Sequence, residues 1–159
     1  LGDAVGERTL GRNQAEAVLW EGTQVITLTG LGGDSSSARD INDRKQMVGE
    51  STTRVGEIIR AFGRWRSERD PWLKRILNPL TSPIVRSKLA WQQPVLWEDG
   101  EPRKLNDLIP QGSGWTLWDA VAINNLGQIV GQGLIGGELH AFLMTPMEKS
   151  NPGKGFPGY

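Results

Sequence analysis

The sequence has no cysteine and a single histidine, His140. Without cysteine the chain can form no disulfide, no thiolate nucleophile and no cysteine-ligated zinc site, and one histidine cannot build a histidine cluster around a metal ion. The enzyme classes that depend on those groups are excluded. We therefore expect no metal site and no cofactor.

The chain also lacks long apolar runs and an excess of charge of either sign. No stretch approaches the ~18 consecutive apolar residues of a membrane span. The opening LGDAVGERTL has neither an initiator Met nor the layout of a signal peptide. Basic and acidic side chains number 18 each, so net charge favours neither nucleic acid nor an anionic membrane. We expect a soluble protein, processed or part of a longer one, that does not bind nucleic acid.

Glycine, by contrast, is abundant, at 21 of 159 residues, and proline adds 9. Glycine supplies the positive φ angles of tight turns, so this composition favours many short strands joined by turns.

Three phrases recur in a constant order along the chain. They are Val-Gly before a polar residue, a Leu-Trp phrase (AVLWEG, PVLWEDG and the variant AFLMTP), and an Ile-Asn phrase (DINDRKQMVGES and AINNLGQIVGQG). Val5 to Val48 spans 43 residues, within the ~40 to 50 of a four-stranded propeller blade. Val48 to Val130 spans 82, which indicates either an insertion or a degenerate extra unit.

The Ile-Asn phrase predicts a β-hairpin, because apolar residues flank the turn-forming stretch Asn124-Asn125-Leu126-Gly127. In the first copy Lys45 stands where the second has Gly127. A positive φ at Lys45 would cost about 1 kcal/mol.

The Leu-Trp phrases predict strands. Turn residues follow each phrase, and the next stretches, QVITLTGL and PRKLNDLI, predict further strands. Each unit thus offers about four short strands. The predicted fold is all-β, with antiparallel repeat units of a partial β-propeller. Three to four units fall at or below the ~4 blades that close a ring. A sheet edge would then be exposed unless the insertion caps it, copies self-associate or the array continues.

One stretch, from Arg66 to Gln93, fits no repeat. Residues 52–91 carry nine basic and three acidic side chains, and DPWLKRIL has the N-cap and apolar spacing of a short amphipathic helix. This short helical or irregular insertion either covers an open edge of the repeats or meets an anionic partner. The predicted division is 1–51 for the first repeat, 52–93 for a degenerate strand at 61–65 plus the basic insertion, 94–147 for the last repeat, and 148–159 for a disordered tail.

These phrases resemble the bacterial HAF repeats, whose His-Ala-Phe motif is matched by His140-Ala141-Phe142. The likeness covers roughly residues 5–51 and 94–146. Lys45 in place of a turn glycine, Met144 in place of the usual Trp, and the unmatched insertion depart from it. The resemblance implies an extracellular or cell-surface protein with propeller-like repeats, and it supplies no catalytic residues.

Candidate sites for chemistry are few. DINDRKQMVGES begins like a calcium-binding loop, but Arg44 and Lys45 occupy ligand positions. The serines 35–37 read as a loop tip, and His140 as a structural residue preceding a strand. The carboxylates that a hydrolase would need stand mostly in turn or cap contexts: Asp34, Asp40, Asp43, Asp99, Asp107 and Asp119.

Tryptophan remains as a ligand-binding candidate, because its flat face stacks on sugars and cations. Trp20 and Trp97 hold equivalent repeat positions and are assigned to packing. Trp115 and Trp118 follow a Gly-Ser-Gly loop and are the ligand-binding candidates, against the alternative that they are buried by a neighbouring unit.

We therefore expect a non-catalytic secreted or cell-surface binding module, with a carbohydrate or another cell-envelope component as ligand. The alternative is a carboxylate-dependent glycoside hydrolase or lyase on a propeller scaffold. A purely structural part of a larger secreted protein is the third interpretation.

Overall fold

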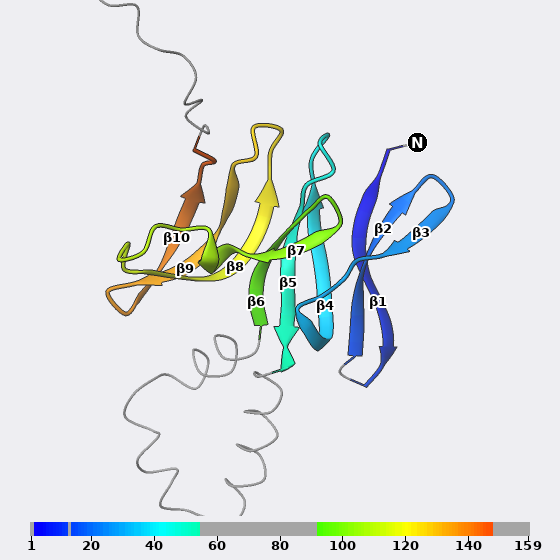
Figure 1. Ribbon diagram of the computed structural model, residues 1–159, viewed down its shortest axis with the longest axis horizontal. Coiled ribbons are helices and arrows are strands. Elements are labelled where there is room, and N and C mark those ends of the chain that lie inside the picture. The colour runs from blue at the N-terminus through cyan, green and yellow to red at the C-terminus, as the bar shows by residue number, and fades with distance from the viewer. Residues whose placement is uncertain (1, 13, 55–91, 148–159) are drawn as a thin grey trace, which may run out of the picture.

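A computed structural model of the chain describes residues 2–12, 14–54 and 92–147, which form ten strands and one short 3-10 turn (Figure 1). The strands are β1 (Ala4–Gly11), β2 (Gln14–Glu21), β3 (Gln24–Thr27), β4 (Gly32–Ile41), β5 (Met47–Thr53), β6 (Gln92–Glu98), β7 (Glu101–Lys104), β8 (Trp115–Ile123), β9 (Ile129–Ile135) and β10 (Glu138–Met144), with the turn η1 at Leu105–Asp107. The prediction of an all-β, mainly antiparallel fold is confirmed. The predicted helix, degenerate strand and disordered tail lie outside the described residues.

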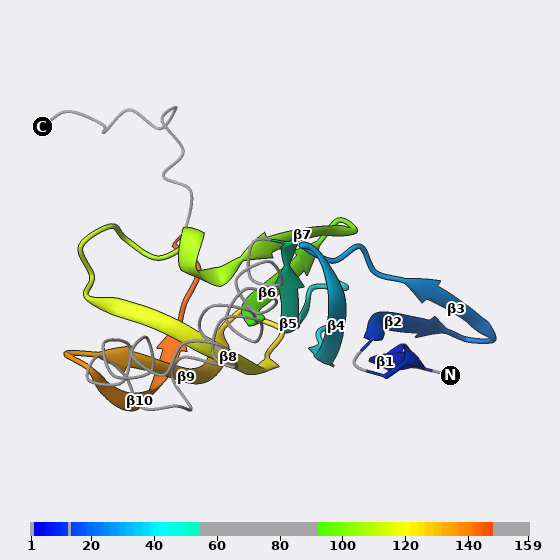
Figure 2. The same cartoon turned by 90° about the horizontal axis from the view of Figure 1, so that it is seen from below.

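The strands form two open sheets. One sheet has the order β1-β2-β4-β5-β6-β7 with β3 paired to β2, and the other has the order β10-β9-β8. Within the larger sheet, β2 and β4 share a single parallel bridge, Ala15 with Ser35. The molecule therefore divides into three antiparallel groups, which lie side by side in Figures 1 and 2. We call them the first unit (β1–β3), the second unit (β4–β7) and the third unit (β8–β10).

The register of the strands repeats from unit to unit. In each unit the strand of the Val-Gly phrase pairs with the strand of the Leu-Trp phrase. The valine of the first phrase lies opposite the leucine of the second. The facing pairs are Val5 with Leu19, Val48 with Leu96, and Val130 with Leu143. Because β5 pairs directly with β6, the long spacing between Val48 and Val130 reflects an insertion within the second unit.

The two Ile-Asn phrases form the same hairpin turn. The amides of Lys45 and Gly127 donate to the carbonyl oxygens of Asn42 and Asn124, both at 2.9 Å. Lys45 has a φ of 57° and Gly127 a φ of 77°, so Lys45 adopts the positive φ whose cost was considered above. The first strand of each hairpin also carries a β-bulge shortly before the turn. The bulge lies between Ala38 and Asp40 in β4 and between Ala120 and Ala122 in β8.

Two apolar cores lie between consecutive units. The core between the first and second units contains Ala17, Leu19, Leu28, Ala38, Met47, Val95 and Trp97. The core between the second and third units contains Val48, Leu96, Leu105, Leu117, Ala120, Ile123, Ile129 and Phe142. Alternate residues of β5 and β6 enter opposite cores, since neighbouring side chains on a strand point to opposite faces. The second unit is thus covered on both faces.

Three details differ from the sequence-based expectations. The serines 35–37 belong to β4 and are no loop tip; Ser36 is buried and its Oγ accepts the amide of Ala17 at 2.9 Å. His140 lies within β10, which begins two residues earlier at Glu138. Trp97 is buried as predicted, but Trp20 is partly exposed, because the first unit has no neighbour on its outer side among the described residues.

Candidate functional site

Among the described residues, the third unit lacks the last strand that the other two units have. In the first unit β3 pairs with the outer edge of β2, and in the second unit β7 pairs with β6 in the same register. Each of these last strands leads directly into a buried leucine, Leu28 or Leu105. In the third unit β10 pairs with β9 only, so within the described part of the chain its other edge carries no strand.

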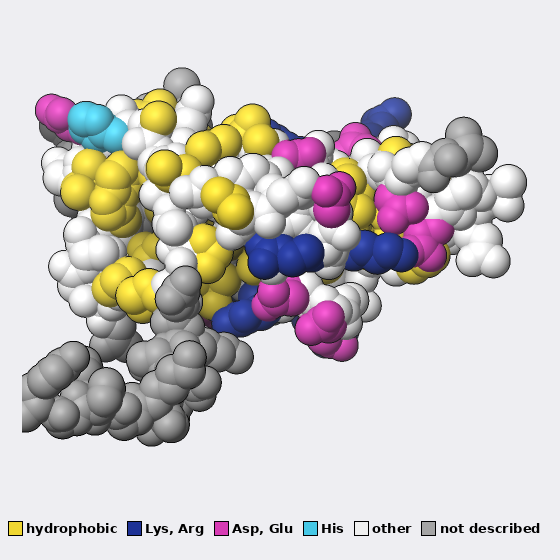
Figure 3. Space-filling view, turned by 90° about the horizontal axis from the view of Figure 1, so that it is seen from above, with side chains coloured by type: hydrophobic (Ala, Val, Ile, Leu, Met, Phe, Trp, Pro, Cys, Tyr) yellow, Lys and Arg dark blue, Asp and Glu magenta, His cyan; other side chains and the backbone are white. Residues whose placement is uncertain are grey.

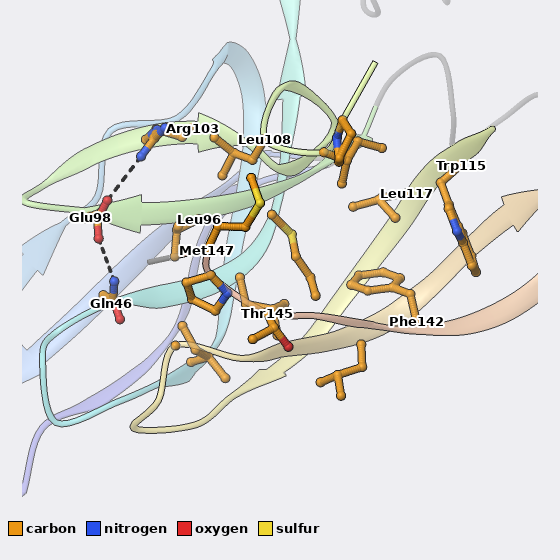
Figure 4. Close-up of a pocket in the computed structure, with 18 of the residues that line it drawn as sticks. Gln46, Leu96, Glu98, Arg103, Leu108, Trp115, Leu117, Phe142, Thr145 and Met147 are labelled. Atoms are coloured by element: carbon orange, nitrogen blue, oxygen red, sulfur yellow. Dashed lines mark hydrogen bonds and ion pairs between the residues drawn. The ribbon is translucent and has the colours of Figure 1, made fainter. Parts of the chain in front are cut away.

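A groove with a volume of about 680 Å³ runs along this strand (Figure 4). Every residue from Ala141 to Met147 lines it, on both faces of the strand, as expected of a groove that follows a strand edge. The opposite wall comes from the second unit and from the loop after η1, and it includes Leu96, Leu108 and Ile109. The groove is therefore a mainly apolar channel between the second and third units.

The groove has one polar end. Glu98 lies there between two partners, as Figure 4 shows: Gln46 Nε2 donates to its Oε1 at 2.6 Å, and Arg103 Nη1 donates to its Oε2 at 3.2 Å. Both carboxylate oxygens of Glu98 are engaged, so the side chain is held in place with its charge balanced by Arg103. The polar end thus places a half-exposed guanidinium and an amide beside an apolar channel.

The two candidate tryptophans lie in different surroundings. Trp115 begins β8 and lines the groove at the end opposite Glu98 (Figure 4). Its ring meets that of Phe142 edge to face, with centroids 6.5 Å apart and planes at 73°, a favourable aromatic geometry. Trp118 lies at a β-bulge of β8 and is half-buried, and it does not line the groove. The structure therefore does not bring the pair together in this groove.

The candidate carboxylates are spread over the molecule. Asp40 accepts backbone amides of Ile41 and Ile123 at 3.0 and 2.7 Å. Asp43 contacts Asn125, and Asp119 forms an ion pair with Arg39 at 3.0 Å. Of the described residues that line the groove, Glu98 is the single carboxylate, whereas glycoside hydrolysis generally uses two.

Within the described ranges, no cluster of His, Asp and Glu is arranged to hold a metal ion, and no helix there is long and apolar enough to cross a membrane. No protein-family model matches the chain, and no curated protein or solved structure is significantly similar to it. The resemblance to HAF repeats stays a prediction.

The sequence contains a signal for the groove in the residues that follow each Leu-Trp phrase. The phrases AVLWEG and PVLWEDG are each followed within nine residues by a short strand and then a leucine, Leu28 or Leu105. No leucine follows AFLMTP. The absence of this leucine distinguishes the third copy of the phrase and coincides with the open edge of β10.

Proposed function

We propose that this protein is a non-catalytic binding module of propeller-like repeat units, and that the groove along β10 holds its ligand. One observation carries the proposal: the groove follows a strand edge that is covered in the other two units and that no described strand covers in the third. An open strand edge offers unpaired backbone donors and acceptors to a further strand.

The ligand class that fits is an extended polypeptide segment. The first and second units already hold such a segment, a short strand followed by Leu28 or Leu105. Leu28 shares a core with Leu19, and Leu105 shares one with Leu96. Leu143 is the equivalent residue of β10 and is exposed. A bound strand would pair with β10 and place its leucine on Leu143.

A carbohydrate ligand is less well supported by the groove. That expectation depended on Trp115 and Trp118 presenting their faces together, and only Trp115 lines the groove. Apart from the polar end around Glu98, the remaining walls are mainly apolar, with Leu108, Phe142 and Met144, and offer few partners to sugar hydroxyls. Carbohydrate is accordingly the comparison arm of the experiment below.

The propeller-like arrangement is proposed from two features: units of up to four antiparallel strands, and a buried core between each consecutive pair of units. The described units form no closed ring. A secreted or cell-surface location is proposed from the resemblance to HAF repeats.

The chain supplies its own probe for this site. A synthetic peptide of residues 23–30, TQVITLTG, contains β3 and Leu28 and should bind to the intact protein in calorimetric titration. A peptide with Leu28→Asp should bind at least tenfold more weakly, because it loses the apolar anchor. The amides of β10 should exchange more slowly with deuterium when the first peptide is bound.

Two protein variants locate the binding. Leu143→Lys should weaken binding of the peptide, whereas Leu126→Lys, a change at another exposed leucine, on the hairpin loop and not lining the groove, should not. Equal binding of both peptides, or unchanged exchange at β10, would refute a strand site. Binding of soluble polysaccharides that is lost in Trp115→Ala would instead place a sugar in the groove.

A further inference from the structure

The outward face of the third unit carries apolar residues that are buried elsewhere in the molecule. Val130 is 42% exposed and Leu143 is 62% exposed. Their equivalents in the second unit, Val48 and Leu96, are 0% and 8% exposed. These equivalents belong to the core that the second unit forms with the third. The third unit thus repeats one half of an interface, with no described residue covering it.

The outward face of the first unit carries the other half. In the second unit, Trp97 faces the first unit and is 0% exposed, with its Nε1 donating to the carbonyl oxygen of Thr29 at 2.7 Å. Its equivalent Trp20 is 37% exposed, and Val25, which lies opposite Trp20 in the register, is 50% exposed. The first unit therefore presents the side that, in the second unit, receives a neighbour.

From these two faces we infer that copies of this chain associate head to tail, with the third unit of one copy packed on the first unit of the next. The inner junctions show the contact twice. At each of them the Val and Leu positions of one unit meet the Trp or Met positions of the following unit: Leu19 shares a core with Trp97, and Leu96 packs with Met144. The outward faces of the third and first units could form a third junction of this kind between two copies.

The surface composition agrees with this occupant. Figure 3 shows apolar side chains gathered over β8–β10, while acidic and basic side chains lie mostly over the middle and the first unit. A small protein seldom exposes several large apolar residues on one face without a partner. A second copy supplies a matching apolar face, whereas a highly charged partner would not.

The junction between copies would lack some polar contacts that the junction between the second and third units has. Between the second and third units the hairpin loops are joined by Asn42 and Asp43 of one loop and Asn124 and Asn125 of the other. The first unit has no such hairpin in the described residues, so these polar contacts are not repeated between copies. The association should therefore be weaker than the contact between units and should depend on concentration.

The faces at the two ends differ, which makes the interface heterologous, and a heterologous interface adds copies one after another. Sedimentation of the whole chain should show a mass that rises with concentration beyond that of a dimer. Val130→Lys alters one face and Trp20→Lys the other, and each variant alone should sediment as a monomer. In a mixture, the Trp20→Lys chain keeps an intact third unit and the Val130→Lys chain keeps an intact first unit. The two variants should therefore form a one-to-one dimer that grows no further.

Controls separate this result from unfolding. Val25→Lys alters the face of Trp20 at a more exposed position and should behave like Trp20→Lys if both remain folded by circular dichroism. Met147→Lys lies on the groove and not on either outward face, and it should associate like the natural chain.

A natural chain that stays monomeric at all concentrations would overturn the inference. Single variants that still dimerise would also overturn it, because that outcome indicates a symmetric interface. Leu143 belongs to both the outward face and the groove. The two positions varied here, Val130 and Trp20, do not line the groove, so failure of the association leaves the proposed peptide site unaffected.

Discussion

Asn42 Nδ2 donates a hydrogen bond to the backbone carbonyl oxygen of Asn124 at 3.0 Å. The two asparagines are 82 residues apart and hold the same position in two copies of one hairpin. Each also organises its own turn: Oδ1 of Asn42 accepts the amides of Arg44 and Gln46, all at 3.0 Å, and Asn124 makes the equivalent bonds. The repeated phrase thus builds a turn and, in the first copy, a contact with the next unit.

Asn42→Ala should destabilise the protein more than Asn124→Ala. Asn42 is buried, so its removal leaves the partly buried amide of Gln46 without its acceptor and breaks the bond to the next unit, at a cost of about 2 to 3 kcal/mol. Asn124 is exposed, and water can replace its side chain, so we expect about 1 kcal/mol. Urea denaturation measures both. Equal losses would show that the contact between the loops adds nothing.

Gly131→Ala should prevent correct packing of the third unit. A Cβ at Gly131 would overlap the carbonyl oxygen of Asp119 and lie 2.8 Å from the ring of Phe142. Backbone on one side leaves little room for relaxation, so we expect a loss of more than about 2 kcal/mol. Thermal unfolding checks this prediction. Gly11→Ala is the control, because a Cβ there meets only a side-chain atom, at 3.6 Å.

Asp40→Ala should loosen the junction between the second and third units. Its Oδ2 accepts the amide of Ile123 at 2.7 Å, and a charged acceptor makes this a strong bond. We expect a loss of about 1 to 3 kcal/mol and faster hydrogen exchange at Ile123. Asp40→Asn keeps an acceptor oxygen and should lie between the natural chain and Asp40→Ala. An unchanged exchange rate at Ile123 would contradict this role.

Lys45→Gly should relieve backbone strain at the first hairpin, because Lys45 has a positive φ that glycine adopts freely. The substitution also removes ion pairs from Lys45 to Glu21 and Asp3. Lys45→Ala loses the same ion pairs without the backbone gain. In a comparison of denaturation midpoints, Lys45→Gly should therefore be the more stable of the two variants.

The same lysine gives a pH-dependent prediction. A hydrogen bond and the charge of Glu21, with Asp3 adding to them, raise the pKa of Lys45 above its ordinary 10.5. The ion pair therefore contributes fully below that ordinary pKa and is lost as pH rises through the higher folded value. The stability difference between the natural chain and Lys45→Met should shrink at strongly alkaline pH. A constant difference would show that the ion pair contributes nothing.

Local patterns in the sequence predicted much of the fold. Turn residues between apolar stretches predicted both Ile-Asn hairpins, and the glycine at the equivalent position drew attention to Lys45, which has a positive φ. The Leu-Trp phrases predicted β2 and β6. These features depend on hydrogen bonds and side-chain alternation within a few residues, so the information is present in each short segment.

The sequence by itself determined the strands, the hairpin turns and the order of the repeats. The tertiary structure decided which faces are buried: Trp20 and Trp97 occupy the same phrase, yet of the two only Trp97 has a described unit on that side. It also decided the edge of β10 that no described strand covers, the groove beside it and the bond between Asn42 and Asn124. Each of these depends on segments far apart in the chain, because burial and strand pairing are set by neighbours in space.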